Sequence, residues 1–160
     1  MKEIKLTQGK VALIDDADFE LVSKYKWHAH FDGYNWYART NPIQEGKRSL
    51  LLMHRLILGL ERGDKRQGEH IHHNGLDNRR KEIRICNHQQ NHFNRKSNKN
   101  TTSHFKGVHW HSKIGKWIAQ FKKKKSVHYL GCWELEEVAA LAYDIAATRE
   151  FGEFANCNFN

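Results

Sequence analysis

Short apolar segments separated by polar turns make up the start of the chain. Apolar-rich stretches at 4–7 and 10–14 lie on either side of Gly9, which predicts two short strands joined by a turn. Residues 18–22 follow a polar turn, begin with Asp and carry spaced apolar side chains, so we expect a short helix there. The region therefore predicts a small unit of mixed strands and helices.

Aromatic residues recur in two neighbouring runs, at 27–30 and 36–39. An Asp-Gly pair at 32–33 separates them, and Asp-Gly between alternating runs is a strong signal for a β-hairpin. A further apolar run leads into a helical pattern at 54–58. This pattern ends at Gly59, a typical helix stop.

The middle of the chain, residues 61–95, is poor in large apolar side chains. A turn-rich loop is followed there by an expected strand at 83–86 and by a helix that opens near Asn87. So polar a segment needs another module, a ligand or a metal to hold it. Residues 96–103 are polar and basic, which is typical of a linker.

Strand patterns return in the last part of the chain, at 105–110, 116–121 and 127–130. From about 135 to 149 the apolar period becomes helical. The face of this helix that is expected to be buried consists of Leu135, Val138, Ala142, Ile145 and Ala146. The predicted fold class is α+β, with a C-terminal three-stranded antiparallel sheet packed on one helix.

Positive charge is concentrated in the middle of the chain. The sequence carries 27 Lys and Arg, 18 Asp and Glu and a formal net charge of +9. Between Glu61 and Leu130 there are 17 Lys and Arg against 5 Asp and Glu, so the two ends together are close to neutral. This concentration favours nucleic acid as the partner, and a well-solvated basic surface is the alternative.

Composition also narrows the cellular setting. No apolar run approaches the roughly 18 residues of a membrane helix, and the initial MKEIKLTQGK lacks the apolar core of a secretory signal. Cys86, Cys132 and Cys157 lie far apart and form no Cys-x-x-Cys pair. We therefore expect no membrane partner and a reducing, cytoplasmic location.

The residues best suited to catalysis lie in the segment EHIHHNGLDNRR, which begins at Glu69. Glu69 and His70 are neighbours on an expected strand, so their side chains point to opposite faces and serve different partners. One oxygen ligand from Glu69 and one from Asn91 suit Mg²⁺ (or Mn²⁺), which takes few protein ligands and several waters. His70 is then placed to deprotonate a water that attacks a phosphodiester.

The same segment resembles the HNH endonuclease family of the phage homing type. EHIHHNGLDNRR, IRIC and HQQNHFNRK follow its pattern in order. The resemblance implies a ββα-metal finger with His70 as general base and Glu69 and Asn91 as metal ligands. The middle position of the triad falls at Glu82, where the family commonly has the Asn that braces the loop, whereas Asn78 fits the Asp-Asn-Arg-Arg element of the pattern. A single centre of this kind nicks one strand of double-stranded DNA.

Other functions stay open at this point. Glu82 in place of Asn leaves open a catalytically decayed HNH protein with a DNA-binding or regulatory role. The twelve histidines leave open a structural zinc site formed by His70, His73, Cys86 and His88. Basic charge with interleaved aromatic residues also suits an RNA-binding module.

A second, independent resemblance covers the C-terminal part. FKGVHW, GKWIAQF, HYLG and AALAYDIAATREFGEFANCNF are similar to the plant ethylene-response (APETALA-type) DNA-binding domain. The resemblance implies a three-stranded sheet that lies in the DNA major groove. Core packing is the alternative for Trp110 and Trp117. Leu135 stands where this domain commonly has a helix-capping Thr, a difference worth about 1 kcal/mol.

Together these patterns divide the chain into four expected parts. They are a strand-rich segment at 1–60 that packs on the nuclease, the HNH finger at 61–95, a basic linker at 96–103 and a DNA-binding domain at 104–160. Double-stranded DNA is the expected partner of a monomer or homodimer, and His54 and Arg55 are weaker candidates for contacting it. The side chains expected to contact DNA are Arg79, Arg80, Arg84, Arg95, Lys96, Lys99, Lys106, His109, Trp110, Lys116, Trp117 and Lys122.

Overall fold

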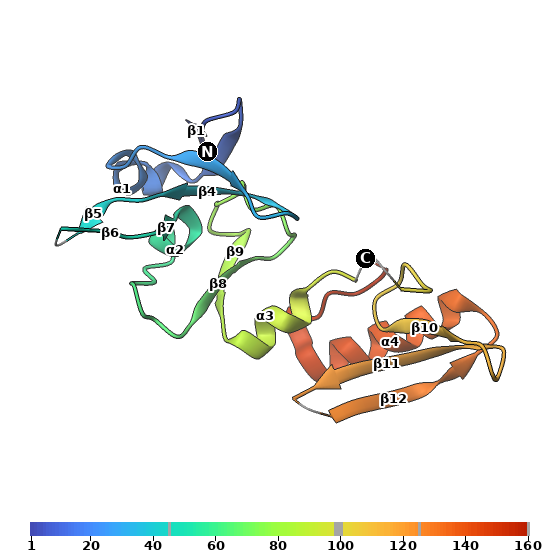
Figure 1. Ribbon diagram of the computed structural model, residues 1–160. Helices are drawn as coiled ribbons and strands as arrows, with labels where there is room; N and C mark the ends of the chain where they lie inside the picture. The colour runs from blue at the N-terminus through green and yellow to red at the C-terminus, as the bar shows by residue number, and fades with distance from the viewer. Residues whose placement is uncertain (45, 98–100, 125, 160) are drawn as a thin grey trace. The chain divides into compact units, whose positions relative to one another are not determined.

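The computed structural model describes residues 1–44, 46–97, 101–124 and 126–159, and the chain divides into two compact units. The first unit is Met1–His88 and the second is Gln89–Asn160. Both combine short antiparallel strands with helices, which agrees with the α+β class expected from the sequence (Figure 1). Within the described ranges, no helix has the length and apolar character needed to cross a membrane.

The first unit is built from small antiparallel strand pairs. Its elements in chain order are β1 (Lys2–Lys5), β2 (Val11–Ile14), the 3-10 helix η1 (Asp16–Asp18), α1 (Phe19–Ser23), β3 (His28–Phe31), β4 (Trp36–Thr40), β5 (Ile43–Gln44), β6 (Lys47–Arg48), β7 (Leu51–Leu52), α2 (Met53–Ile57), β8 (Gln67–His70) and β9 (Ile83–Cys86). β1 pairs with β2, β5 with β6 and β8 with β9, while β4 lies between β3 and β7 in a three-stranded sheet.

Two turn signals in this unit are confirmed. The hairpin predicted around the Asp-Gly pair is formed by β3 and β4, whose register sets Phe31 opposite Trp36. Gly33 in its turn has φ +97°, a conformation that side chains with a Cβ rarely adopt. The helix predicted before Gly59 is α2, and Gly59 has φ +66° directly after it.

One apolar core joins the N-terminal segment to the central hairpin. Its buried members come from strands and helices spread over the whole unit: Ala12, Ile14, Val22, Trp27, Ala38, Met53, Ile57 and Ile83. Ile83 lies on β9, directly after the polar loop. Ile83 from the polar middle of the chain therefore shares one core with the N-terminal strands.

The second unit is a sheet covered by a helix. α3 (His88–Asn94) starts at the last residue of the first unit, and it is followed by β10 (Val108–His111), β11 (Lys116–Lys123), β12 (Ser126–Trp133), α4 (Glu136–Phe151) and the 3-10 helix η2 (Gly152–Phe154). β10, β11 and β12 form the predicted three-stranded antiparallel sheet, with an irregularity between Ala119 and Gln120. α4 packs against β11 and β12.

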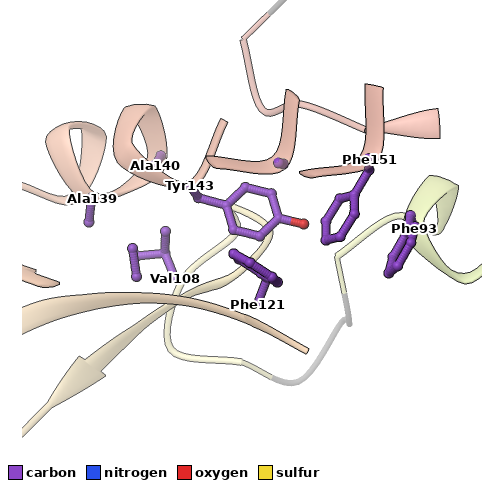
Figure 2. Packing of buried hydrophobic residues seen from close by; sticks show 9 residues of the cluster. Phe93, Val108, Phe121, Ala139, Ala140, Tyr143 and Phe151 are labelled. Carbon is purple, nitrogen blue, oxygen red and sulfur yellow. The ribbon is translucent and has the colours of Figure 1, made fainter. Parts of the chain in front are cut away.

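Aromatic side chains fill the core between this sheet and α4 (Figure 2). The rings of Phe93 and Phe151 stack with centroids 3.6 Å apart, and Phe121 meets Phe151 edge-on at 5.2 Å. Phe93 comes from α3, so the C-terminal part of that helix is packed into the second unit. Stacked and edge-on rings at such distances add to the stabilisation that burial itself provides.

The buried face predicted for the C-terminal helix is wrong. Leu135, Val138 and Ile145 are 62, 40 and 65% exposed. The residues that α4 buries are instead Ala139, Ala140, Tyr143, Asp144, Ala147 and Phe151.

The space left by the side chains of the sheet explains why a different face of α4 is buried. The sheet already contributes the large side chains of Trp117 and Phe121 to the core, so the facing helix approaches closely through alanines. Asp144 is tolerated there because its carboxylate accepts backbone N–H groups of Asn158 and Phe159, each at 2.8 Å. Alanines, the hydrogen-bonded Asp144 and the aromatic Tyr143 and Phe151 thus face the core, and the larger aliphatic residues face outward.

Candidate active site

The hairpin of β8 and β9 carries the two residues that the sequence singles out most strongly. Its register sets Glu69 opposite Arg84 and His70 opposite Ile83. Glu69 and His70 are both buried, with 5 and 7% of their surfaces exposed. As alternation along a strand predicts, their side chains meet different partners.

His70 lies among polar and aromatic groups of the same unit. Its Nε2 is 3.3 Å from Oδ1 of Asn78, and its ring centroid is 4.7 Å from that of His54 and 5.8 Å from that of Tyr37. Burial lowers the pKa of His70 to about 4, although the hydrogen bond with Asn78 acts in the opposite direction. At neutral pH the imidazole is therefore uncharged and able to accept a proton.

Asn78 fixes both the loop and the imidazole. It is fully buried, its backbone N–H donates to the carbonyl of Leu13 at 2.8 Å, and its Nδ2 donates to the carbonyl of Leu76 at 3.1 Å. With Nδ2 used in this way, Oδ1 is the atom that accepts from Nε2 of His70. This arrangement places the hydrogen of His70 on Nε2 and leaves Nδ1 as the basic nitrogen.

Glu69 has one carboxylate oxygen paired and one unpaired. Its Oε1 accepts from Nε of Arg84 at 2.6 Å, and both side chains are largely buried. Its Oε2 is buried and has no hydrogen-bond partner among the described residues. A buried carboxylate oxygen without a partner is costly, and it fits a hard cation that prefers oxygen ligands. Glu69 is thus chemically suited to hold a divalent metal.

The described residues offer no larger metal-binding group. No cluster of three or more His, Cys, Asp or Glu side chains is placed to share an ion within those ranges. The zinc alternative built on His70, His73, Cys86 and His88 therefore finds no support. A Mg²⁺ site with few protein ligands does not require such a cluster.

Comparison with known proteins identifies the family. No protein-family profile matches the chain. A protein of Acanthamoeba polyphaga mimivirus named as an uncharacterized HNH endonuclease, L560, is 33% identical over an alignment of 155 residues that covers 94% of this chain and 76% of that relative. The chain belongs to the HNH endonuclease family.

Within the HNH segment, the residue in contact with the general-base candidate lies outside the triad position that the pattern gives. The pattern points to Glu82 and sets Asn78 aside, but Asn78 is the residue in contact with His70. The cause is a turn before Asn78, in which the N–H of Asp77 donates to the carbonyl of Asn74. This turn brings Asn78 back to the strand that carries His70.

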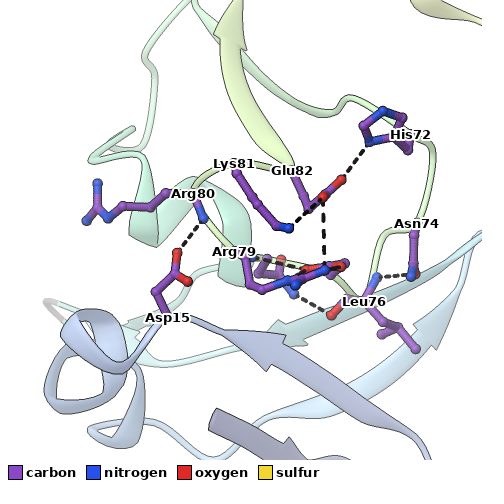
Figure 3. A network of polar contacts seen from close by, with 10 residues as sticks. Asp15, His72, Asn74, Leu76, Arg79, Arg80, Lys81 and Glu82 are labelled. Atoms are coloured by element: carbon purple, nitrogen blue, oxygen red, sulfur yellow. Dashed lines mark hydrogen bonds and ion pairs between the residues drawn. The ribbon is translucent and has the colours of Figure 1, made fainter. Parts of the chain in front are cut away.

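Glu82 supports the same loop through different contacts (Figure 3). Its Oε2 lies 2.6 Å from Nδ1 of His72, and its Oε1 lies 3.9 Å from Arg79 and 4.0 Å from Lys81. Its backbone carbonyl also accepts the N–H of Ile71 at 2.8 Å. Glu82 therefore ties together the two ends of the loop between β8 and β9.

Asn91, the second expected metal ligand of the HNH motif, lies on α3 and is half-buried. It belongs to the second unit, whereas Glu69 belongs to the first. Joint coordination by the two residues stays a prediction.

Three of the four arginines expected to bind DNA in the HNH segment, Arg79, Arg80 and Arg84, form ion pairs within the first unit. Arg79 meets Asp77, with Nε 2.8 Å from Oδ1, and Arg80 meets Asp18, with Nη2 2.6 Å from Oδ1. Arg84 is paired as described above and is only 13% exposed, whereas the side chain of Arg80 is 58% exposed. DNA contact stays a prediction for all three, and Arg80 presents the most accessible guanidinium.

In the second unit the predicted DNA-contacting residues do not share one face of the sheet. Trp117 packs against the core under α4, and Trp110 lies opposite it in the register with ring centroids 5.1 Å apart. By alternation along the strands, His109, Lys116 and Lys122 lie on the other side. The core-packing alternative is therefore the better description of Trp117.

Several of the basic residues predicted to contact DNA line one cavity of the second unit. The cavity has a volume of about 340 Å³, and its cationic lining residues include Arg95, Lys96, Lys106 and Lys122. The ammonium of Lys106 donates to the carbonyl of Phe93, and burial lowers the pKa of Lys106 to about 8. Lys99, also predicted to contact DNA, lies outside the described residues.

Two neighbours of His70 carry no local signal in the sequence. His54 and Tyr37 reach it from α2 and β4, far away along the chain. His54 is 5% exposed and packs beside His70, and DNA contact by His54 stays a prediction. A Cβ at Gly68 would lie 2.8 Å from the His54 ring, which shows that a glycine there lets the ring pack.

Proposed function

We propose that this protein is a divalent-metal-dependent endonuclease that hydrolyses phosphodiester bonds of double-stranded DNA. The observation that carries the proposal is the pair of adjacent residues on β8. His70 is an uncharged imidazole oriented by Asn78, and Glu69 has a buried carboxylate oxygen without a partner in the described part of the chain. The mimivirus relative, itself named an HNH endonuclease, supports the same activity.

Each residue has a defined role in this proposal. Nδ1 of His70 takes the proton of the attacking water, and Asn78 keeps the ring in the tautomer that this requires. Glu69 and Asn91 would hold Mg²⁺ or Mn²⁺, and the bound metal supplies stabilisation of the negative charge that develops on the scissile phosphate. Arg84 holds the Glu69 carboxylate in position from the neighbouring strand.

The second unit is proposed to hold DNA for the nuclease. Its sheet carries His109, Lys116 and Lys122 on the side away from α4, and cationic side chains line its cavity. Lys and Arg contacts to phosphates make binding strongly dependent on salt. The order β8, β9, α3 along the chain is the order of a ββα-metal finger. One such centre nicks one strand, and a homodimer would cut both.

A catalytically decayed, DNA-binding protein is the alternative, and position 82 motivates it. The contact between Asn78 and His70 favours an intact site, because the imidazole is braced although Glu82 replaces the usual Asn. A homing role and a location in the cytoplasm of a host cell are proposed on the resemblance to phage HNH proteins alone.

The proposal is tested with supercoiled plasmid incubated with the protein and Mg²⁺ or Mn²⁺. We expect conversion to nicked circles, suppression by EDTA and loss of activity in His70→Ala. His104→Ala is the matched control, because His104 is an exposed histidine of the second unit. Absence of nicks with either metal would overturn the proposal.

A further inference from the structure

The tip of the β3–β4 hairpin exposes aromatic side chains to solvent. Tyr34 is 81% exposed and Phe31 is 48% exposed. Most other aromatic side chains of the described residues are less exposed than these two, and exposed apolar surface of this kind marks binding sites. Neither residue is part of the candidate active site around His70 and Glu69.

The turn presents Tyr34 on a well-ordered support. Oδ1 of Asp32 accepts the backbone N–H groups of Tyr34 at 2.8 Å and of Asn35 at 2.7 Å. Below the turn, the rings of Phe31 and Trp36 lie with centroids 5.2 Å apart. A side-chain acceptor that caps two backbone donors is an Asx turn, which holds the tip in one conformation. The Asp32 carboxylate is thereby occupied within the turn.

The hairpin is attached directly to the loop that follows His70. Nδ2 of Asn35 donates to the carbonyl of His73 at 2.6 Å. Gly75 lies so close to the hairpin that a Cβ there would be 2.3 Å from the carbonyl oxygen of Trp36. Farther along β4, Tyr37 contacts the His70 ring. The aromatic tip and the candidate active site are therefore parts of one connected structure.

A lysine side chain lies next to the aromatic residues of this hairpin. Nζ of Lys10 lies over the Trp36 ring, 5.0 Å from its centroid. The β1–β2 turn that carries Lys10 is held to the same sheet, because the Thr7 hydroxyl accepts the N–H of Ala29 at 3.0 Å. Exposed aromatic rings beside a lysine are the combination that stacks on bases while binding phosphates.

We infer that Phe31 and Tyr34 form a second DNA contact, which stacks on bases of the duplex beside the phosphate that faces His70. The inference rests on the proposed nuclease function and specifies how the substrate is held. Aromatic side chains inserted at a base step unstack it and bend the duplex, which exposes the backbone there. Phosphate contacts in the second unit would supply affinity, and this tip would deform the DNA at the site of cleavage.

The test compares Tyr34→Ala, Phe31→Ala and Tyr34→Trp with the wild-type protein. Binding to a 40-base-pair duplex is measured by fluorescence anisotropy in EDTA, and unstacking by the fluorescence of 2-aminopurine placed at several positions of that duplex. Ile43→Ala is the matched control, since Ile43 is a 70% exposed apolar residue of the same unit on another hairpin. Thermal unfolding shows whether each variant is folded, and the two alanine variants test the tip independently.

Removal of the Tyr34 ring is expected to weaken binding between about fivefold and a hundredfold and to abolish the rise in 2-aminopurine fluorescence. Tyr34→Trp should keep both signals, and Ile43→Ala should change neither. Unchanged binding and fluorescence in both alanine variants would overturn the inference. So would an equal loss in Ile43→Ala, or a change in oligomeric state without a change in DNA binding.

These readouts do not require cleavage, so the two proposals fail separately. A wild-type protein that does not nick plasmid but shows Tyr34-dependent unstacking overturns the nuclease proposal and supports the DNA contact. A protein that nicks with unchanged rate in Tyr34→Ala and Phe31→Ala supports the nuclease proposal and overturns the DNA contact.

Discussion

Oδ1 of Asn78 lies 3.3 Å from Nε2 of His70, and Asn78 is completely buried. The same asparagine accepts and donates hydrogen bonds that connect β2, the polar loop and the candidate general base. Its backbone N–H reaches Leu13, and its side-chain amide reaches Leu76. The N-terminal segment therefore helps to hold the residue that contacts the candidate general base.

Asn78→Ala is expected to reduce both activity and stability. The substitution removes the bond that orients His70 and one of the two donors to the Leu76 carbonyl, which keeps the N–H of Leu13, so we expect a loss of about 1 kcal/mol for each lost hydrogen bond. Nicking rates and chemical denaturation measure the two effects. Asn74→Ala, an exposed substitution in the same loop that removes only the acceptor of the Leu76 N–H, should have a smaller effect on both. Equal effects of the two substitutions would contradict the role of Asn78.

Glu82→Asn is expected to leave nicking unchanged or lower it. The carboxylate of Glu82 pairs with His72 and lies near Arg79, so Asn loses charge interactions that hold the loop. Plasmid nicking by the two proteins at equal concentration measures the difference. A large gain of activity in the variant would identify a decayed site and contradict the proposed assignment.

Arg84→Ala should destabilise the metal-free protein strongly. It leaves the Glu69 carboxylate buried without its counter-charge, and breaking a buried ion pair costs about 3–5 kcal/mol. Adding Mg²⁺ or Mn²⁺ should recover part of this loss. In the double variant Arg84→Met with Glu69→Gln, stability should recover and the response to metal should disappear. Thermal unfolding with and without metal provides the readout, and a metal response that persists in the double variant would exclude Glu69 as a ligand.

Acid should destabilise the first unit through His54. Burial and the neighbouring His70 lower the pKa of His54 from 6.5 to about 3 in the folded protein. Between these values the unfolded chain takes up a proton that the folded protein does not, so stability falls as the pH falls. From pH 6.5 to pH 4.5 the loss from His54 is about 2–3 kcal/mol. Urea denaturation at the two pH values should show a smaller loss for His54→Phe, and an equal loss would contradict this origin.

Leu135→Thr is expected to stabilise the second unit. Leu135 is the N-cap of α4, is 62% exposed and makes no side-chain capping bond. A threonine hydroxyl there can accept a free N–H of the first helical turn, which is worth about 1 kcal/mol. The melting temperature reports the gain. Leu141→Thr, an exposed substitution inside the same helix, should give none.

Local patterns in the sequence predict many elements of this fold. Turn residues and the spacing of apolar residues predict the Asp-Gly hairpin, the strand from Ile83 and the three-stranded C-terminal sheet. The same signals predict α3 and α4. The buried face of α4 does not, because hydrophobicity alone favours Leu135 and Ile145 over the alanines that actually face the core. Which side of a helix is buried depends on the volume that the sheet leaves free.

Local sequence patterns likewise predict only part of the candidate site. His70 and Glu69 are recognisable from adjacent residue types, whereas the neighbours of His70 are brought to it by the tertiary fold. His54 and Tyr37 come from α2 and β4, and Asn78 reaches His70 only because the loop turns back. A motif aligned by spacing selects Glu82, which holds the loop, but does not reveal that Asn78 contacts His70.

The most direct measurement compares plasmid nicking by wild-type, His70→Ala and His104→Ala proteins with Mg²⁺ or Mn²⁺. Removal of a general base typically slows a reaction by about 10²–10⁴-fold. We expect a loss of that size in His70→Ala, with wild-type rates in His104→Ala and unchanged DNA binding in both. A His70→Ala protein that nicks as fast as the wild type would contradict it.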